Sequence, residues 1–197
     1  MKEAHKEQKE RRNVPMPSPQ KKVYTADDYW NLPEGERAEL INGQLIIMTP
    51  PNRIHQKLVH QFGKVIGNYI DAKHKDCEVY LAPFAVNLTA DERTWVEPDI
   101  SVICDKNKLT ERGCEGAPDF IVEIESPGSR RPDYLLKMTL YSEAGVREYW
   151  IVDPEKKRTT VYRFEEDAAP TIFPFDQAIS VGIFEDLQIT VSELLSK

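Results

Sequence analysis

The sequence lacks the features of a membrane or exported protein. It has no apolar run that approaches the roughly 18 residues needed for a membrane-spanning helix. The N-terminal stretch MKEAHKEQKERR is charged, and no apolar segment follows it, so the pattern of a secretory signal is also missing. We therefore expect no membrane partner for this chain.

Cysteine is scarce as well. The 197 residues include three cysteines, Cys77, Cys104 and Cys114, and no two of them form a CxxC pair. An odd number of widely spaced cysteines is poor material for a structural zinc site or a disulfide framework. We therefore expect neither, and we expect a reducing cytoplasm as the location.

The chain also lacks the positive charge that is typical of a simple nucleic-acid coat protein. Its formal net charge is −7, unevenly distributed. Residues 1–22 hold seven Lys or Arg and three Glu, which gives them a net charge of +4 and leaves −11 for residues 23–197. We predict a disordered basic arm over residues 1–22 and a single domain over residues 23–197. Such an acidic domain should repel a phosphate backbone unless a basic strip or bound metal ions offset its charge.

Helical and extended patterns alternate along the predicted domain. Asn42-Gly43 between two short apolar runs predicts a β-hairpin. Apolar residues at helical spacing predict one long amphipathic helix within residues 49–74. A strand–helix–strand pattern over residues 119–153 predicts a right-handed parallel crossover. We expect further strands at 77–82, 84–88, 97–103 and 158–164, and a short helix at 191–197. The predicted fold class is α/β, with a mixed central sheet flanked by helices on both faces.

The strand within PDFIVEIES is apolar enough to be buried, yet it carries two acids on one face. Because side chains alternate along an extended chain, Glu123 and Glu125 share a face, while Val122 and Ile124 point to the other. A buried carboxylate is costly unless a cation or hydrogen bonds compensate it. We therefore expect a compensating group over these two acids.

Asp99 is the best candidate to share a divalent cation with Glu123. It lies 24 residues upstream, which leaves room for a neighbouring strand and a loop. Two carboxylates from adjacent strands, together with a backbone carbonyl, suit a hard cation such as Mg²⁺. Asp119 begins the strand of Glu123 and, at ~3.3 Å per residue, lies about 13 Å away, too far to share a metal. A simpler interpretation is a buried Asp99–Glu123 pair that backbone amides or an arginine satisfy.

Several other side chains could complete such a site. Lys137 is expected on the helix after the acidic strand, where its ammonium group could orient a metal-bound water or stabilise charge on a phosphate. Glu39, in the hairpin, could complete the metal shell. Arg130 and Arg131 precede the helix and are candidates for phosphate contacts. Two of these residues also have simpler interpretations, Lys137 as a solvated helix residue and Glu39 as a surface partner of Arg37.

These residues lie in strings that resemble a known family. Pro98-Asp99 and Glu123-Ile124-Glu125 resemble the signature of the PD-(D/E)XK nuclease superfamily, with Glu125 in the place of its lysine. The strings ELINGQL, PPNRIHQKL, EPDISVI and PDFIVEIESPGSRRPDYLLKMTLYSEAGVREYWIVDP resemble the Uma-two family of restriction endonucleases, a bacterial branch of that superfamily. The resemblance runs from about Tyr24 to Val191.

The resemblance implies a restriction-endonuclease-like fold and a Mg²⁺- or Mn²⁺-dependent endonuclease that hydrolyses phosphodiester bonds in DNA. Asp99 and Glu123 match the metal ligands. Lys137 matches a lysine that has moved from the strand to the helix, where it assists the base or stabilises charge. Glu39 matches the acid of the first hairpin. His55 matches a histidine at the start of the long helix, although it could also merely decorate that helix start.

Glu125 departs from the family pattern and leaves alternatives open. It could be an additional ligand or a water-binding base, or it could weaken phosphate binding by lowering the positive field. One alternative is therefore a catalytically weak or inactive nuclease-fold module that binds nucleic acid or a protein partner. Another is a glycosidase that uses Glu123 and a second acid, which predicts no metal requirement. Because nucleases that cut duplexes often work as dimers, we also expect a symmetric homodimer.

Overall fold

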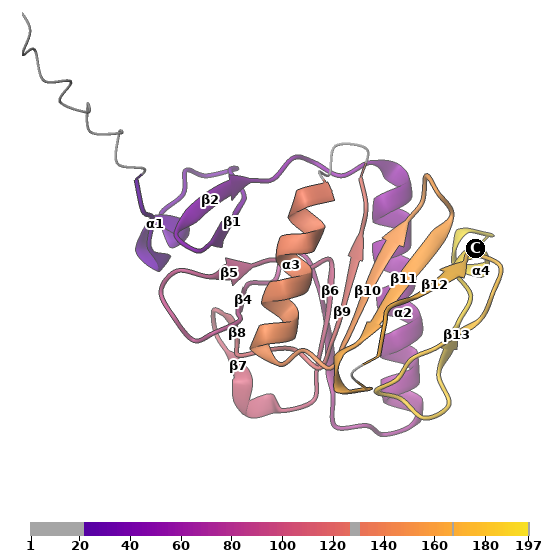
Figure 1. Ribbon diagram of the computed structural model, residues 1–197. Coiled ribbons are helices and arrows are strands. Elements are labelled where there is room, and N and C mark those ends of the chain that lie inside the picture. The colour runs from indigo at the N-terminus through magenta and orange to yellow at the C-terminus, as the bar shows by residue number, and fades with distance from the viewer. Residues whose placement is uncertain (1–21, 127–130, 167, 197) are drawn as a thin grey trace, which may run out of the picture.

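The computed structural model describes residues 22–126, 131–166 and 168–196, with the backbone alone for residues 131–133 (Figure 1). The predicted basic arm over residues 1–22 lies outside these ranges except for its last residue. No helix in the described ranges is long and apolar enough to cross a membrane.

The described residues form four α-helices and two short 3₁₀ helices. They are α1 (Ala26–Trp30), α2 (Arg53–Ala72), η1 (Lys106–Lys108), α3 (Arg131–Ala144), η2 (Phe164–Glu166) and α4 (Val191–Ser196). The long amphipathic helix and the C-terminal helix are confirmed. Asn52 caps α2, because its Oδ1 accepts a hydrogen bond of 2.9 Å from the backbone N–H of His55. This cap fixes where α2 begins and therefore where His55 lies.

The central sheet has six strands in the order β12-β11-β10-β9-β6-β3. Their bounds are β3 (Glu78–Leu81), β6 (Ile100–Ile103), β9 (Phe120–Ile124), β10 (Glu148–Asp153), β11 (Arg158–Arg163) and β12 (Thr171–Pro174). β9 and β10 are parallel and α3 connects them, while the other neighbours are antiparallel. The predicted mixed sheet and its parallel strand–helix–strand unit are confirmed.

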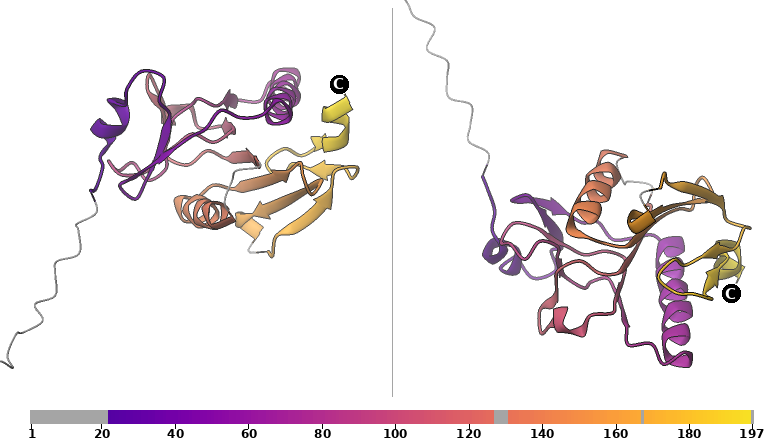
Figure 2. Two further views of the ribbon diagram at one scale, coloured as in Figure 1. Left: turned by 90° about the horizontal axis from the view of Figure 1, so that it is seen from above. Right: turned by 60° about the horizontal axis from the view of Figure 1, so that its bottom comes forward.

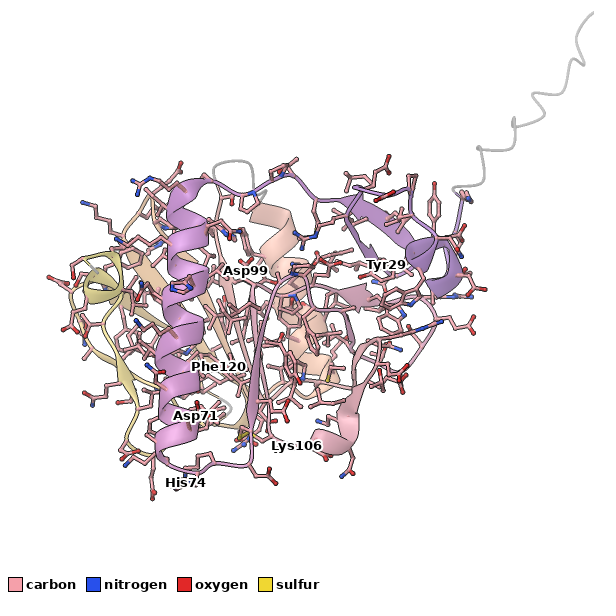
Figure 3. All side chains as sticks on the ribbon, turned by 180° about the vertical axis from the view of Figure 1, so that it is seen from behind. Tyr29, Asp71, His74, Asp99, Lys106 and Phe120 are labelled. Carbon is pink, nitrogen blue, oxygen red and sulfur yellow. A yellow bond between two sulfur atoms is a disulfide. The ribbon has the colours of Figure 1, made fainter. Side chains whose placement is uncertain are left out.

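Helices cover both faces of the central sheet, as the sequence predicted (Figure 2). On one face, Phe62 of α2 packs edge-on against Trp150, and Phe120 lies beneath the same helix (Figure 3). On the other face, Tyr141 of α3 packs against Tyr149 of β10. A short hairpin of β13 (Ile179–Ser180) and β14 (Gln188–Ile189) leads into α4 beside α2. The alternating side chains of β9 therefore enter two separate cores.

A second six-stranded sheet lies beside the first, in the order β2-β1-β5-β4-β8-β7. Its strands are β1 (Ala38–Ile41), β2 (Gln44–Ile47), β4 (Val86–Asn87), β5 (Trp95–Val96), β7 (Leu109–Thr110) and β8 (Gly113–Glu115). The predicted hairpin is confirmed, with φ of 50° at Asn42 and 74° at Gly43. The sequence did not predict this second sheet, because most of its strands are only two or three residues long. Residues 105–117 contain η1, β7 and β8.

The expectation for the cysteines was wrong in one respect. Cys77 and Cys104 form a disulfide, and Cys114 is free and buried. Antiparallel pairing of β3 with β6 sets Glu78 opposite Ile103, which brings the two flanking cysteines together although 27 residues separate them. The sequence separation concealed this contact. The pairing removes the reason for which a reducing compartment was expected.

Candidate active site

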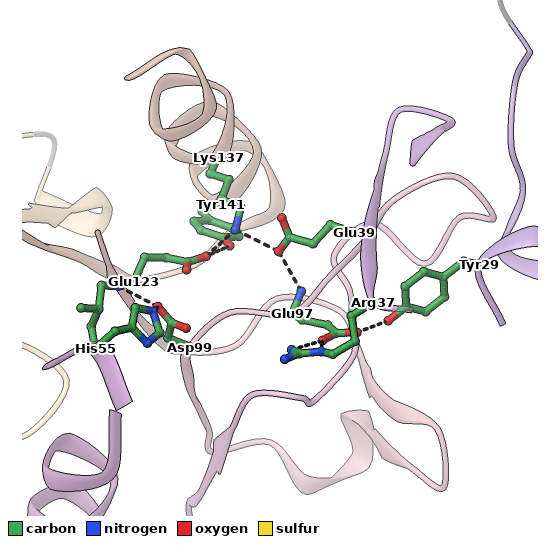
Figure 4. A network of polar contacts seen from close by, with 10 residues as sticks. Tyr29, Arg37, Glu39, His55, Glu97, Asp99, Glu123, Lys137 and Tyr141 are labelled. Atoms are coloured by element: carbon green, nitrogen blue, oxygen red, sulfur yellow. Dashed lines mark hydrogen bonds and ion pairs between the residues drawn. The ribbon is translucent and has the colours of Figure 1, made fainter. Parts of the chain in front are cut away.

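Five of the predicted site residues line one pocket between the hairpin of the second sheet, the first turns of α2 and the face of α3 (Figure 4). The pocket has a volume of about 240 Å³. Its wall includes Glu39, His55, Asp99, Glu123 and Lys137. Polar side chains from distant parts of the sequence thus lie together in one pocket. They come from strands, from the start of α2 and from one face of α3.

Asp99 and Glu123 lie on neighbouring antiparallel strands of the central sheet. Ile100 pairs with Val122, so the register sets Asp99, just before β6, opposite Glu123 of β9. Both acids are buried, with relative exposures of 8% and 6%. Asp99 Oδ2 accepts a hydrogen bond of 2.8 Å from the backbone N–H of Ile124, which ties this carboxylate to the strand of Glu123.

Lys137 connects Glu123 with Glu39. Its Nζ lies 2.8 Å from Glu123 Oε1 and 2.9 Å from Glu39 Oε1, so one ammonium group bridges acids from the two sheets. The simpler interpretations of Lys137 and Glu39 are excluded. Lys137 is largely buried rather than solvated, and Arg37 pairs with Glu97 rather than with Glu39. This bridge is part of the compensation that two buried acids require.

His55 lies on the other side of Asp99. Its Nε2 is 3.0 Å from Asp99 Oδ2, and both side chains are largely buried. His55 Nδ1 is buried and has no hydrogen-bond partner among the described residues. The histidine therefore contacts a predicted metal ligand directly and does more than begin a helix.

The sequence did not single out two further members of this network. Tyr141, one turn after Lys137 on α3, donates a hydrogen bond of 2.8 Å to Glu123 Oε1. The backbone N–H of Glu97 donates a hydrogen bond of 3.0 Å to Glu39 Oε1. Tyr141 is fully buried. The sequence signal for Tyr141 is its spacing of four residues from Lys137, which places both side chains on one face of the helix.

Glu125 lies away from the pocket. Its Oε2 is 4.0 Å from Lys156 Nζ, near the end of β10, and it does not line the pocket wall. Burial and the nearby charge of Asp153 raise the pKa of the Glu125 carboxyl. The structure thus does not bring Glu125 to the acids that line the pocket. Arg130 lies outside the described residues, and of Arg131 only the backbone at the start of α3 is described.

Asp119 also lies elsewhere, as the strand geometry predicted. Its Oδ2 accepts a hydrogen bond of 2.8 Å from the backbone N–H of Cys104, and its Oδ1 is 3.3 Å from the guanidinium of Arg147. These contacts lie at the opposite end of β9 from Glu123. Asp119 therefore has a structural role.

Burial and charge together set the protonation of the site. Burial raises the pKa of Glu123 to about 7, with Asp99 and Glu39 adding to the rise and Lys137 opposing it. Burial alone would lower the pKa of Lys137, but the charges of Glu123 and Glu39 outweigh it and raise that pKa. The lysine is therefore an ammonium ion, whereas Glu123 exchanges its proton near neutral pH.

The donor atoms of Asp99 and Glu123 fit a hard divalent cation. Each acid uses one oxygen, Oδ2 or Oε1, in the contacts above, and no hydrogen bond or ion pair of the described residues reaches Asp99 Oδ1 or Glu123 Oε2. Within the described ranges, no group of three or more His, Cys, Asp or Glu side chains is arranged as a metal site. Two carboxylates completed by water match the coordination that Mg²⁺ commonly adopts.

Comparisons with known proteins agree with this architecture. A solved chain described as "a putative nuclease belonging to DUF820", from Anabaena variabilis ATCC 29413, is similar with a TM-score of 0.72 and 24% identity, over 87% of this chain and 97% of that chain. This likeness confirms the nuclease-like fold. "Uncharacterized protein slr1290" of Synechocystis sp. (strain ATCC 27184 / PCC 6803 / Kazusa) is 22% identical over 139 residues, 70% of this chain and 72% of that protein.

The model of the Uma2 family, described as "Putative restriction endonuclease", matches residues 26–192. The matched range includes every predicted site residue. The match confirms the resemblance to this family that the sequence motifs indicated. The chain belongs to the Uma2 family.

Proposed function

We propose that this protein is a Mg²⁺- or Mn²⁺-dependent endonuclease that hydrolyses phosphodiester bonds in DNA. The convergence of Asp99, Glu123 and Lys137 in one pocket is the observation that carries the proposal. Two carboxylates that can bind a metal ion, beside a buried lysine ammonium group, are the groups that metal-assisted phosphodiester hydrolysis requires. Membership of a family described as restriction endonucleases supports the same reaction.

Asp99 and Glu123 would hold the cation through the oxygens that make no contact within the described residues. When bound, the cation would lower the pKa of a water molecule and balance negative charge on the phosphate. His55 and the backbone N–H of Ile124 fix the orientation of Asp99 through its other oxygen. Tyr141 does the same for Glu123. Each ligand is thus held on one side and available on the other.

Lys137 would stabilise the phosphate as charge develops on it. An ammonium group has three N–H donors, and the described residues accept two of them, at Glu39 and Glu123. The third can donate to a phosphate oxygen without breaking either ion pair. Glu39, which also accepts from the backbone of Glu97, holds Lys137 in place and is in this scheme a positioning residue.

Cleavage of supercoiled plasmid with Mg²⁺, with Mn²⁺ and with EDTA tests the proposal. We expect nicking that requires a divalent cation and that falls by at least about 100-fold in Asp99→Asn and Glu123→Gln. Glu143→Gln, an exposed glutamate on α3, is the matched control and should cleave at the wild-type rate. A folded wild-type protein that cleaves no DNA with either metal would contradict the proposal and favour a nuclease-fold module that only binds.

A further inference from the structure

A second groove lies next to the proposed catalytic pocket. It has a volume of about 430 Å³ and is bounded by α1, the β3–β4 connection and the β7–β8 hairpin. Its lining includes four aromatic side chains, Tyr29, Trp30, Tyr80 and Phe84. The proposed cleavage chemistry uses none of them.

The aromatic rings of the groove are held in fixed orientations. Tyr80 and Phe84 stack with their ring centres 4.1 Å apart and their planes at 11°. Trp30 contacts Tyr29 and Trp95 edge-to-face, with ring centres 4.9 Å and 5.2 Å away, and remains 37% exposed. Large, preorganised aromatic surfaces that stay accessible to solvent are what unpaired nucleobases stack on.

A cation also lines this groove. The guanidinium of Arg112 lies 5.5 Å from the centre of the Trp30 ring, and Arg112 forms no ion pair with any described residue. The carboxylate of Glu97 is already occupied, because Tyr29 donates to its Oε1 at 2.9 Å and Arg37 pairs with its Oε2. Glu111 is the other acid of the lining and is exposed. An available arginine beside aromatic rings suits a base attached to a phosphate.

One wall separates this groove from the catalytic pocket. Ala82 lines the catalytic pocket, and the next residue, Pro83, lines the groove. Arg37 lines the catalytic pocket as well, while its guanidinium binds Glu97 of the groove (Figure 4). A strand that places a phosphodiester in the pocket would therefore bring a neighbouring base to the aromatic rings.

Among the described residues, apolar side chains form part of the exposed lining of the catalytic pocket. Ile46, Ile47 and Leu136 line the pocket and are exposed on the surface. Proteins grip an intact duplex mainly through Lys and Arg contacts to its phosphates. Exposed apolar side chains suit the ring faces of bases that have left a duplex stack.

We propose that the aromatic groove binds an unpaired nucleobase of the strand whose phosphodiester enters the catalytic pocket. The substrate class is then single-stranded DNA, or DNA with an unpaired base beside the cleavage position. This inference rests on the proposed endonuclease function. Base pairing buries the ring faces in the duplex stack, so a fully paired strand offers the groove nothing to stack on.

Binding measured without cleavage tests the inference. The probes are a fluorescein-labelled oligothymidylate of eight nucleotides and an abasic oligonucleotide with the same phosphates, each titrated in EDTA and followed by anisotropy. We expect oligothymidylate to bind at least about fivefold more tightly. Trp30→Leu should raise its Kd about 5- to 150-fold and leave the abasic Kd unchanged. Trp30→Phe, which keeps an aromatic ring, should bind almost as the wild type does.

A second aromatic variant covers the case in which Trp30→Leu does not fold. Phe84→Leu should weaken oligothymidylate binding in the same way, whereas Phe173→Leu, a half-buried phenylalanine of β12, is its control. Equal Kd values for the two probes, or groove variants that bind oligothymidylate normally, would overturn the inference. If the binding test fails in either way but the wild type nicks plasmid with Mg²⁺, the groove inference is wrong and the endonuclease proposal stands. Base-dependent binding without any cleavage would support the groove and contradict the endonuclease.

Discussion

Lys137 and three largely buried acids line one pocket. Glu39, Asp99 and Glu123 are each less than a tenth exposed, and one ammonium group bridges two of them. His55 contacts the third, so the acids outnumber the lysine three to one. This imbalance is the residue-scale reason to expect a divalent cation, because repulsion between the acids disfavours their ionisation unless further positive charge is present.

The hydrogen bond of Tyr141 can be tested against a tyrosine that lacks one. Tyr141→Phe removes the donor to Glu123, and because a charged acceptor is left buried we expect the free energy of unfolding to fall by about 1–3 kcal/mol at pH 8. Tyr149→Phe removes the same atom from an equally buried ring whose hydroxyl has no partner among the described residues. That variant should be neutral or stabilising in urea unfolding. Equal losses in the two variants would contradict the assignment.

Glu123 makes stability depend on pH in a predictable direction. Its pKa is about 7 in the folded protein against 4.5 for an unperturbed glutamate, so between these values the folded chain binds more protons than the unfolded chain. The free energy of unfolding should therefore fall as pH rises from 4.5 to 7, by an amount on the order of 3 kcal/mol.

Urea unfolding in EDTA across this pH range measures that dependence. Glu123→Gln should show a smaller slope than the wild type, with the remainder due to Glu125 and Glu148, whose pKa values burial also raises. Glu143→Gln is the control and should retain the full slope. Parallel curves for the wild type and Glu123→Gln would show that Glu123 does not take up this proton on folding.

At the scale of elements, the site depends on where the two sheets meet. β9 and the start of β6 carry the proposed metal ligands, α3 carries the lysine, and β1 of the second sheet carries Glu39. The bridge from Lys137 to Glu39 therefore joins the sheets. A displacement of the second sheet should move Glu39 and loosen the lysine.

Gly113 of β8 lies against the backbone of Ala85, the residue just before β4. A Cβ at this position would lie 2.1 Å from the carbonyl oxygen of Ala85, so Gly113→Ala must displace backbone, and we expect a loss of about 3 kcal/mol or more. Gly145→Ala is the matched control, because it also has a positive φ, 93°, but nothing lies within 4 Å of the added atom. It should cost only about 1–2 kcal/mol. Thermal unfolding of both variants gives the comparison, and similar losses would contradict the predicted clash.

Periodicity predicted the elements that are long enough to show it. The 20 residues of α2 carry a clear helical pattern, and Asn42-Gly43 marks a turn that backbone stereochemistry requires. The strands β4, β5 and β7 have two residues each, too few to show alternation, so their sheet could not be predicted. Glu123 could be predicted because a buried acid on a strand is unusual, and Asp99 because its spacing from Glu123 leaves room for a neighbouring strand.

The positions of Glu125 and Glu97 depend on tertiary geometry that a local sequence pattern does not predict. Glu125 shares the strand face of Glu123 by alternation, yet it lies past the last residue of β9 and turns towards Lys156. Glu97 joins the site through its backbone N–H, which every residue except proline has. The sequence therefore could not distinguish either residue from its neighbours.

At the scale of the whole molecule, the disulfide ties one edge of the central sheet. Cys77 and Cys104 close a loop of 27 residues, for which chain entropy predicts a stabilisation of about 3–4 kcal/mol. Dithiothreitol should therefore lower the melting temperature of the wild type, while the Cys77→Ser/Cys104→Ser variant should melt at the lower temperature with or without reductant. A wild-type melting temperature that reductant does not change would contradict this contribution.

The most direct test of the central proposal is the rate at which the protein nicks supercoiled DNA in Mg²⁺, compared between the wild type and Lys137→Met. Lys64→Met removes a lysine from the exposed side of α2 and controls for the loss of charge. We predict that Lys137→Met remains folded but nicks at least about 100-fold more slowly, and that Lys64→Met matches the wild type. Nicking by Lys137→Met at the wild-type rate would contradict the assignment of this pocket as the catalytic site.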